Sequence, residues 1–271
     1  MVGALGSERE LAGIWRCCGG GSAVRLIRQS GRELARPPVF CEASMVPILL
    51  HDDKSPISIP GGIESFSDFR AWTKSQTFPT TGRIDYVASQ IEVDMSPEEF
   101  FSHGGPKEAL ARTLGPIVHA EALGYLRIDR IRVVADAVQL SAEPDLLFVS
   151  HESLDAGRVQ LSSPRKRGKT SYLEVTGGPD LVVEVVSPSS VNKDTQRLPL
   201  AYFAAGVREY WIVDARGDDL VFKIQTRGRT AFRTAPVDAE GFAKSRVFAR
   251  RFRLTRHTNS RGHLVYDLLV R

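Results

Sequence analysis

Hydrophobic and polar positions alternate between residues 83 and 94 of this 271-residue chain. Ile84, Tyr86, Ile91 and Val93 fall on one side of the alternation. A period of two is typical of a strand or hairpin with one buried face. We therefore predict a strand or hairpin here, with these four side chains pointing inward.

The pattern then changes to that of helices. Ser96, Pro97 and Glu99 form a helix-start signature, because the serine can cap, the proline suits the first turn and the glutamate can complete a capping box. A second helical stretch is expected from 106 to about 123. Its apolar residues recur at helical spacing: Leu110, Leu114, Ile117 and Val118.

Short apolar runs beyond residue 124 predict strands. We expect strands near 125–134 and 144–149, and a hairpin formed by 158–161 and 171–175. The run LVVEVV at 181–186 is apolar on both faces, as in a central strand that is buried on both sides.

A strand–helix–strand unit follows from this central strand. A helix is expected from about 192 to 205, ended by Gly206, and the next strand covers 209–213. This order implies that the two strands pair in parallel. Because the chain beyond 220 again alternates, the sequence predicts an α/β protein with a mixed central sheet flanked by helices, and with β additions at both ends.

The first 44 residues differ from the rest. All three cysteines lie there, at Cys17, Cys18 and Cys41, and no sustained period is present. We expect this segment to be mostly disordered. One hypothesis is that translation begins at Met45, in which case the native protein contains no peptide from residues 1–44.

The remaining chain divides into a lead-in and a main domain. Residues 45–80 would be a lead-in segment with a short helix near 67–72, and 81–271 would form the domain. Since no cysteine follows Cys41, thiol chemistry is excluded there. A net charge of +4 permits a nucleic-acid partner without requiring one. No apolar run approaches the roughly 20 residues of a membrane helix, so we expect a cytoplasmic protein without a membrane partner.

Two acidic residues interrupt or precede apolar strands. A charge in a buried strand is costly unless it is paired or bound to metal. Glu184 is therefore either neutralised by a nearby Arg or Lys, or it binds a cation. Asp145 either belongs to a turn that enters a strand, or is a second ligand. Spacing alone leaves both alternatives open.

Three segments around these residues resemble a known family. They are EPDLLFV at 143–149, GPDLVVEVVSPSS at 178–190 and YFAAGVREYWIVD at 202–214. In this order they are similar to the Uma-two family of bacterial endonucleases, in the PD-(D/E)xK restriction-endonuclease-like superfamily. The resemblance covers about 80–271 and is most specific over 143–214.

The resemblance implies a restriction-endonuclease-like core near 100–215 and a Mg²⁺-dependent (or Mn²⁺-dependent) endonuclease that hydrolyses phosphodiester bonds, with DNA as the expected substrate. Asp145 and Glu184 would be catalytic metal ligands, and the backbone carbonyl of Val185 would complete the shell. Magnesium suits such oxygen ligands. The resemblance also suggests a homodimer.

One position departs from the superfamily pattern. Lysine is expected two residues after Glu184, and this chain has Val186 there. Relatives supply a basic residue from the following helix, commonly at the position of Leu198. The candidates here are Lys193, which we prefer as the catalytic charge, and Arg197. Both are otherwise ordinary surface charges.

Accessory residues each have a plain alternative. His103 would face the metal site or touch a phosphate, or would be a surface histidine in a Gly-rich turn. Glu92 would project towards the site, or would be a surface charge of the hairpin. A basic turn would contact nucleic-acid phosphates, or would be a solvated hairpin tip: Arg165, Lys166, Arg167 and Lys169.

A rival interpretation follows from Val186. A nucleic-acid-binding or protein-interaction module could keep this fold and lack catalysis. A weaker rival is a metal-dependent hydrolase that acts on another phosphoester.

Overall fold

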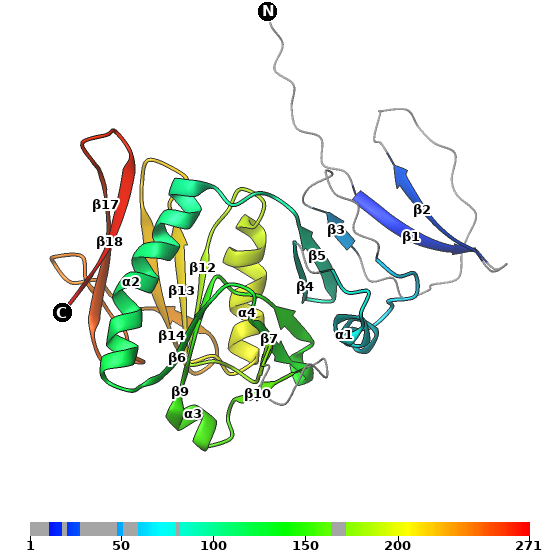
Figure 1. Cartoon of the computed structure of the whole chain (residues 1–271), viewed down its shortest axis with the longest axis horizontal. Helices are drawn as coiled ribbons and strands as arrows, with labels where there is room; N and C mark the ends of the chain where they lie inside the picture. Colours follow the sequence, from blue (N-terminus) through cyan, green and yellow to red (C-terminus); the bar gives the residue numbers. More distant parts are fainter. Residues whose placement is uncertain (1–10, 18–20, 28–47, 51–58, 80–81, 164–171) are drawn as a thin grey trace, which may run out of the picture. The chain divides into compact units, whose positions relative to one another are not determined.

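The computed structural model describes residues 11–17, 21–27, 48–50, 59–79, 82–163 and 172–271 (Figure 1). The chain divides into two compact units, Met1–Met95 and Ser96–Arg271. The division therefore falls after the hairpin at 83–94, whereas the sequence suggested a boundary near residue 81.

The first unit contains five strands and one helix within the described ranges. β1 pairs antiparallel with β2, β3 runs parallel to β5, and β4 forms an antiparallel hairpin with β5. The elements are β1 (Leu11–Cys17), β2 (Gly21–Ile27), β3 (Ile48–Leu50), α1 (Phe66–Lys74), β4 (Arg83–Val87) and β5 (Gln90–Asp94).

The predicted hairpin and short helix are both present. Ile84, Tyr86, Ile91 and Val93 are buried, as their alternation indicated. They pack with the apolar side of α1, whose aromatic residues Phe66, Phe69 and Trp72 belong to the same core cluster. The lead-in segment thus contributes a packed helix to the first unit.

The expectation of disorder in residues 1–44 needs one correction. Leu11–Cys17 and Gly21–Ile27 are strands, where the sequence pattern predicted no regular structure. The seven-residue antiparallel pairing of β1 and β2 supplies backbone hydrogen bonds that do not depend on an apolar pattern. The other residues of this segment lie outside the described ranges, and translation from Met45 stays a prediction.

The second unit carries the elements around the motif segments. η1 and η3 are π-helical turns, and η2 is a 3₁₀ turn. The elements are η1 (Phe100–Gly104), α2 (Gly105–Ala120), β6 (Gly124–Ile128), β7 (Arg132–Ala135), η2 (Asp136–Val138), β8 (Leu140–Ala142), β9 (Leu146–Ser150), α3 (His151–Asp155), β10 (Gln160–Ser162), β11 (Glu174–Thr176), β12 (Leu181–Val185), η3 (Lys193–Arg197), α4 (Leu198–Ala204), β13 (Glu209–Asp214), β14 (Val221–Arg227), β15 (Phe232–Thr234), β16 (Ala243–Lys244), β17 (Arg251–Thr258) and β18 (Leu264–Val270).

A six-stranded mixed sheet forms the centre of this unit, in the order β15-β14-β13-β12-β9-β6. β12 and β13 are parallel and the other neighbours are antiparallel. The predicted strand–helix–strand unit is therefore confirmed, with Gly206 at a φ of 93° after α4. A smaller sheet, β16-β17-β18, follows at the C-terminal end. The mixed α/β class is confirmed.

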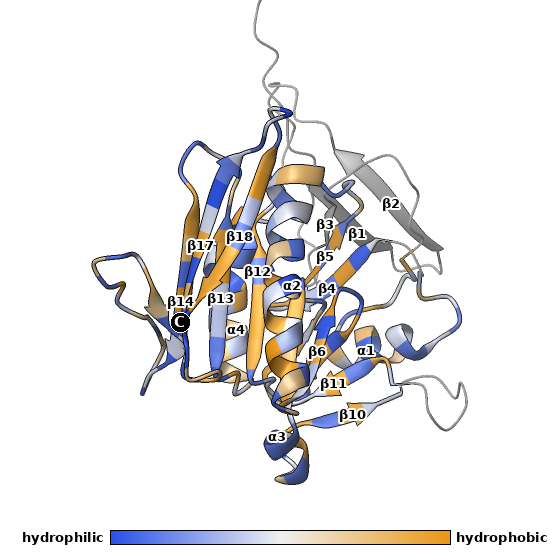
Figure 2. Cartoon of the chain, turned by 60° about the vertical axis from the view of Figure 1, so that its left-hand side comes forward, coloured by the Kyte–Doolittle hydropathy of each residue, from blue (hydrophilic) through white to orange (hydrophobic). Residues whose placement is uncertain are grey.

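Helices α2 and α4 lie on opposite faces of the central sheet (Figures 1 and 2). Leu181, Val183 and Val185 of β12 share a core cluster with Leu110 and Leu114 of α2. The alternate residues of β12 must face α4, because successive side chains of a strand point to opposite faces. Every residue of β12 is buried, as expected for a central strand.

The helical start at Ser96 is not observed. The helical turn begins at Phe100, and Glu99 is its N-cap, since the Glu99 carboxylate accepts the Ser102 N–H. The Ser96 hydroxyl instead lies 3.3 Å from the Ser189 hydroxyl. A polar side chain can cap a helix from either of these two positions. Here the Ser96 side chain contacts Ser189, and Glu99 caps the helical turn instead. In the described parts of the chain, no helix is long and apolar enough to cross a membrane.

Candidate functional site

Of the two acidic residues singled out by the sequence, Glu184 lies within β12 and Asp145 directly precedes β9, the strand next to β12 in the sheet. β9 and β12 are antiparallel, with Leu146 opposite Val183. Asp145 comes next before Leu146, and its Oδ2 accepts a hydrogen bond from the Val185 N–H, so Asp145 lies beside the end of β12 that carries Glu184. Both side chains are buried, with exposed fractions of 0% and 1%.

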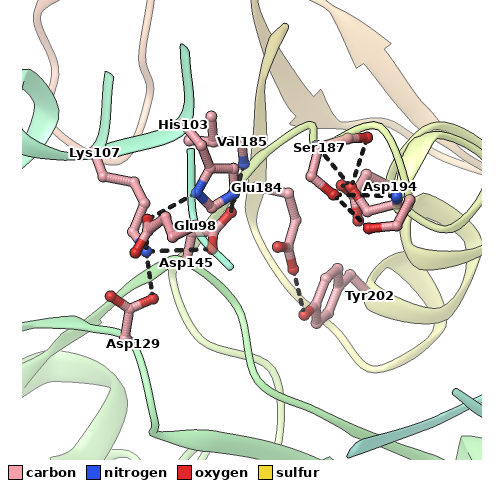
Figure 3. Close-up of polar contacts among 12 residues, drawn as sticks. Glu98, His103, Lys107, Asp129, Asp145, Glu184, Val185, Ser187, Asp194 and Tyr202 are labelled. Atoms are coloured by element: carbon pink, nitrogen blue, oxygen red, sulfur yellow. Dashed lines mark hydrogen bonds and ion pairs between the residues drawn. The ribbon is translucent and has the colours of Figure 1, made fainter. Parts of the chain in front are cut away.

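A hydrogen bond from α4 fixes the side chain of Glu184. The Tyr202 hydroxyl, on α4, donates to Glu184 Oε1 at 3.0 Å and is itself fully buried (Figure 3). The neighbouring Tyr210 hydroxyl donates to the Asp194 carbonyl at 2.7 Å. Burial, with the added negative charge of Glu184, Asp194 and Asp145, raises the pKa of Tyr210 well above its usual value. Tyr210 is therefore a neutral donor here.

Asp145 is surrounded by donors from three elements. The Val185 N–H donates to Asp145 Oδ2 at 2.7 Å. His103 Nε2 lies 3.6 Å from the same oxygen, and Lys107 Nζ lies 3.7 Å from Oδ1. Figure 3 shows these groups on one side of Glu184. The residues predicted as ligands are thus adjacent to a histidine and a lysine from the start of α2.

Lys107 is the centre of a further charged cluster. Its ammonium nitrogen lies 2.6 Å from Asp129 Oδ1 and 2.7 Å from Glu98 Oε1. Glu98 Oε1 also lies 2.7 Å from His103 Nδ1. Burial alone would lower the pKa of Lys107, but the Asp145 charge and the bonds to Asp129 and Glu98 outweigh it and raise the pKa. Lys107 is therefore a cation at neutral pH.

The same contacts act on Glu98. Desolvation raises the pKa of Glu98, but hydrogen bonds from Lys107 and His103 outweigh it, so the pKa is lowered overall. The cluster of Glu98, Asp129, Asp145 and Lys107 consequently contains three carboxylates and one ammonium group. Such an excess of negative charge favours a cation.

A local irregularity positions these side chains. The Gly104 N–H bonds to the Glu99 carbonyl at 2.9 Å, which makes η1 a π turn. His103 and Lys107 are four residues apart at the junction of η1 and α2, a spacing that puts side chains on one side of a helix. π turns within helices occur frequently at functional sites.

The basic candidates from the sequence lie on a second π turn. Lys193 is the first residue of η3 and is 3% exposed, so it is not a surface charge. Arg197 ends the same turn and is partly buried. Val186, at the position where the superfamily pattern has lysine, is fully buried.

The remaining candidates are Glu92 and the basic turn. Glu92 is on β5 of the first unit, opposite Asp85, and is 2% exposed. The surface-charge alternative for Glu92 is therefore wrong, because Glu92 and Asp85 are both buried, on the face of the hairpin opposite to Ile84 and Val93. The basic turn lies outside the described residues: Arg165, Lys166, Arg167 and Lys169.

Four site residues were missed by the sequence analysis: Glu98, Lys107, Asp129 and Tyr202. The available sequence signal for Lys107 was its spacing of four residues from His103. No local sequence pattern identifies Asp129 as a site residue. It reaches Lys107 because β6 ends beside the start of β9, where the Asp129 N–H donates to the Asp145 carbonyl at 3.0 Å.

A separate pocket of about 620 Å³ lies where β9 ends and β13 begins. Its lining includes Asp180 and Glu209 together with Arg208, Arg227 and Arg246. Asp180 accepts hydrogen bonds from the Ser150 N–H at 2.7 Å and the Ser153 hydroxyl at 2.8 Å. These carboxylates are held by structural contacts, and the pocket is not part of the site at Asp145.

A magnesium ion would fit the carboxylate pair. Magnesium usually keeps several waters and binds proteins through one or two carboxylates. Asp145 and Glu184 provide such hard oxygen donors on adjacent strands. Across the ranges that the structure describes, no three His, Cys, Asp or Glu side chains are grouped to hold a metal. The residues fit a two-carboxylate site completed by water.

The fold and the site define an α/β protein whose mixed sheet carries a pair of buried carboxylates on neighbouring strands. The family model described as "Uma2: Putative restriction endonuclease" matches residues 66–248, more than half of the chain. The chain therefore belongs to the Uma2 family, as its three motif segments predicted.

A solved structure is also similar to this chain. It is described as a putative nuclease belonging to DUF820 from Anabaena variabilis. The match has 14% sequence identity and a TM-score of 0.45, and covers 61% of this chain and 83% of that one. No curated protein matches the chain.

Proposed function

We propose that this protein is an endonuclease that depends on Mg²⁺ or Mn²⁺ and hydrolyses phosphodiester bonds of nucleic acid, with DNA as its substrate. The observation that carries the proposal is the pair Asp145 and Glu184, both buried where the chain entering β9 meets the end of β12. Membership of the Uma2 family supports it. The same proposal makes the sheet between α2 and α4 a restriction-endonuclease-like core.

The chain's own residues have distinct tasks in this proposal. Asp145 and Glu184 would hold the metal, with the carbonyl of Val185 beside them. When bound, the metal would polarise the phosphoryl oxygen and stabilise the negative charge of the transition state. The Val185 N–H fixes the Asp145 carboxylate, and the Tyr202 hydroxyl fixes that of Glu184. Both ligands are therefore pre-oriented by groups that do not react.

His103 has the geometry of a proton carrier. Its Nδ1 is placed against Glu98, which leaves Nε2 directed towards Asp145 at 3.6 Å. A histidine whose ring is fixed by a carboxylate can hold or release a proton at the other nitrogen. We assign His103 to proton transfer at the water or leaving group.

A nucleic-acid-binding module without catalysis is the second candidate. The buried Val186 favours it, because no cation stands two residues after Glu184. A homodimer stays a prediction, which sedimentation of the full chain would test.

The decisive experiment compares wild type with Asp145→Asn and Glu184→Gln. Each full-length protein is incubated with plasmid DNA, single-stranded DNA and RNA, with Mg²⁺, Mn²⁺ or EDTA. Asp180→Asn is the matched control, since Asp180 is 1% exposed at the start of β12 but is bound by Arg158 at 2.6 Å.

Metal-dependent cutting by wild type and the control, reduced at least 100-fold in both site variants, is expected. Equal cutting by all four proteins would exclude these carboxylates from the mechanism. Binding of DNA without any cutting by the wild type would favour the binding module. Calorimetry with Mn²⁺ gives a second measurement, because each site variant should lose metal affinity and the control should keep it.

A further inference from the structure

The site needs a positive charge that β12 does not provide. A phosphodiester carries negative charge, and the charge on its oxygens grows during hydrolysis. Asp145 and Glu184 add two further negative charges at the same place. A cation from another element would offset this repulsion, and Lys107 of α2 is 3.7 Å from Asp145.

The contacts of Lys107 show on which side of Asp145 it lies. Asp145 is fully buried, whereas the side chains of Glu98 and Asp129 are 47% and 38% exposed. Lys107 is within hydrogen-bond distance of the two exposed carboxylates, at 2.7 and 2.6 Å, and farther from the buried one. Its ammonium group therefore lies between Asp145 and the solvent.

A phosphate that reaches Asp145 on the side of Glu98 and Asp129 would therefore meet this ammonium group. A lysine that served only to neutralise Asp145 would be expected to make its shortest contact there, because hydrogen bonds between charged groups are about 2.7–2.9 Å long. The shortest contacts of Lys107 are instead with Glu98 and Asp129. Phosphate oxygens can replace either of these carboxylates as the acceptor.

We propose that Lys107 is the phosphate-contacting cation of this site, held by Glu98 and Asp129 until a nucleic-acid phosphate displaces one of them. The inference rests on the proposed function for its substrate class, and it names a different residue from Lys193, the sequence-based candidate. It also gives Asp129 a definite effect, since its carboxylate competes with the phosphate for Lys107.

The test measures binding as well as cutting. A fluorescent DNA duplex is titrated with full-length protein in EDTA at several salt concentrations. Loss of one phosphate contact lowers the slope of log affinity against log salt by about 0.9. A structural role does not change this slope. The variants are Lys107→Met, Lys107→Arg and Asp129→Asn. Lys193→Met tests the sequence-based candidate, and Lys223→Met, which removes an exposed lysine of β14, is the control for loss of one positive charge.

Three results are expected together. Lys107→Met lowers the salt slope by about one and reduces cutting at least 100-fold. Lys107→Arg keeps the slope, and the control Lys223→Met keeps both slope and cutting. Asp129→Asn binds DNA several-fold more tightly, because the competing carboxylate is gone.

Other outcomes overturn the inference. An unchanged salt slope in folded Lys107→Met, or a lowered slope in Lys193→Met alone, would remove Lys107 from the phosphate contact. If Lys107→Met does not fold, unchanged or weaker binding by Asp129→Asn refutes the proposal. If the wild type binds DNA but cuts nothing, the nuclease proposal fails while the salt slopes still decide the role of Lys107. A wild type that binds no DNA refutes both.

Discussion

The hydrogen bond from Tyr202 to Glu184 allows a direct test of whether the buried Glu184 carboxylate is charged. Tyr202→Phe removes one hydroxyl from a fully buried side chain and leaves the ring in place. Tyr210→Phe is a matched change, because Tyr210 is equally buried and its hydroxyl donates to a neutral backbone carbonyl. The two variants differ in the charge of the acceptor.

The magnitudes follow from that difference. A hydrogen bond to a charged group contributes about 1.5–3 kcal/mol to stability, and one to a neutral group about 0.5–1.5 kcal/mol. We expect Tyr202→Phe to lower the free energy of unfolding by about 2 kcal/mol and Tyr210→Phe by about 1 kcal/mol. In a domain of this size, the loss for Tyr202→Phe corresponds to a Tm decrease of roughly 4–8 °C.

The assay is urea denaturation followed by circular dichroism, with both changes repeated in a Glu184→Gln background. There the acceptor of Tyr202 is neutral, so Tyr202→Phe should cost about 1 kcal/mol, as an ordinary neutral hydrogen bond does. Tyr210→Phe should cost the same in both backgrounds. Equal losses for the two tyrosines in the wild-type background would refute the reasoning, because Glu184 would then not be a charged acceptor of this bond.

Three further predictions address stability and binding. Burial raises the pKa of Glu209 above 4.5 in spite of four hydrogen-bond donors. The contribution of Glu209 to stability is therefore present at low pH and is lost as the pH rises through the raised pKa. In urea titrations, Glu209→Gln should flatten this part of the pH dependence of the free energy of unfolding. Gly178→Ala would place a Cβ 2.4 Å from the backbone of Gly206 and should lower the free energy of unfolding by about 2–3 kcal/mol. Gly115 lies inside α2 with open space around its Cα, so in the same titration Gly115→Ala should raise the free energy of unfolding by about 0.5–1 kcal/mol. Phe100 is 79% exposed beside His103, so Phe100→Ala should leave Tm unchanged and, if the ring stacks on a base, weaken DNA binding at least about fivefold in an anisotropy titration.

The alternation of residues 83–94 was a reliable guide because burial and period are directly linked. Each apolar position there became a buried contact, and the run at 181–186, apolar except for Glu184, became a central strand for the same reason. The helix start at Ser96 failed because capping is a weak, local preference. Glu98, two residues later, is drawn to Lys107 and His103, and the turn begins only at Phe100.

The residues of the candidate site also divide into those that the sequence could predict and those that it could not. Asp145 and Glu184 could be found from sequence, since a charge in an apolar strand needs an explanation. Their partners could not, because contacts across elements leave no local pattern. Asp129 is 22 residues from Lys107 in the chain, yet lies 2.6 Å from its ammonium group. The sequence pattern indicated a basic residue on the helix after Glu184, whereas Lys107 precedes Glu184 in the chain, on α2.

The burial of Lys107 shows that the charged cluster offsets an energetic cost. Lys107 is 6% exposed, and burial of its ammonium group carries a desolvation penalty. Three carboxylates compensate for this penalty, and they come from three separate segments, so the arrangement is not a by-product of one element's sequence. A buried cation held by converging acidic residues beside a buried aspartate supports the proposed contact with a nucleic-acid phosphate.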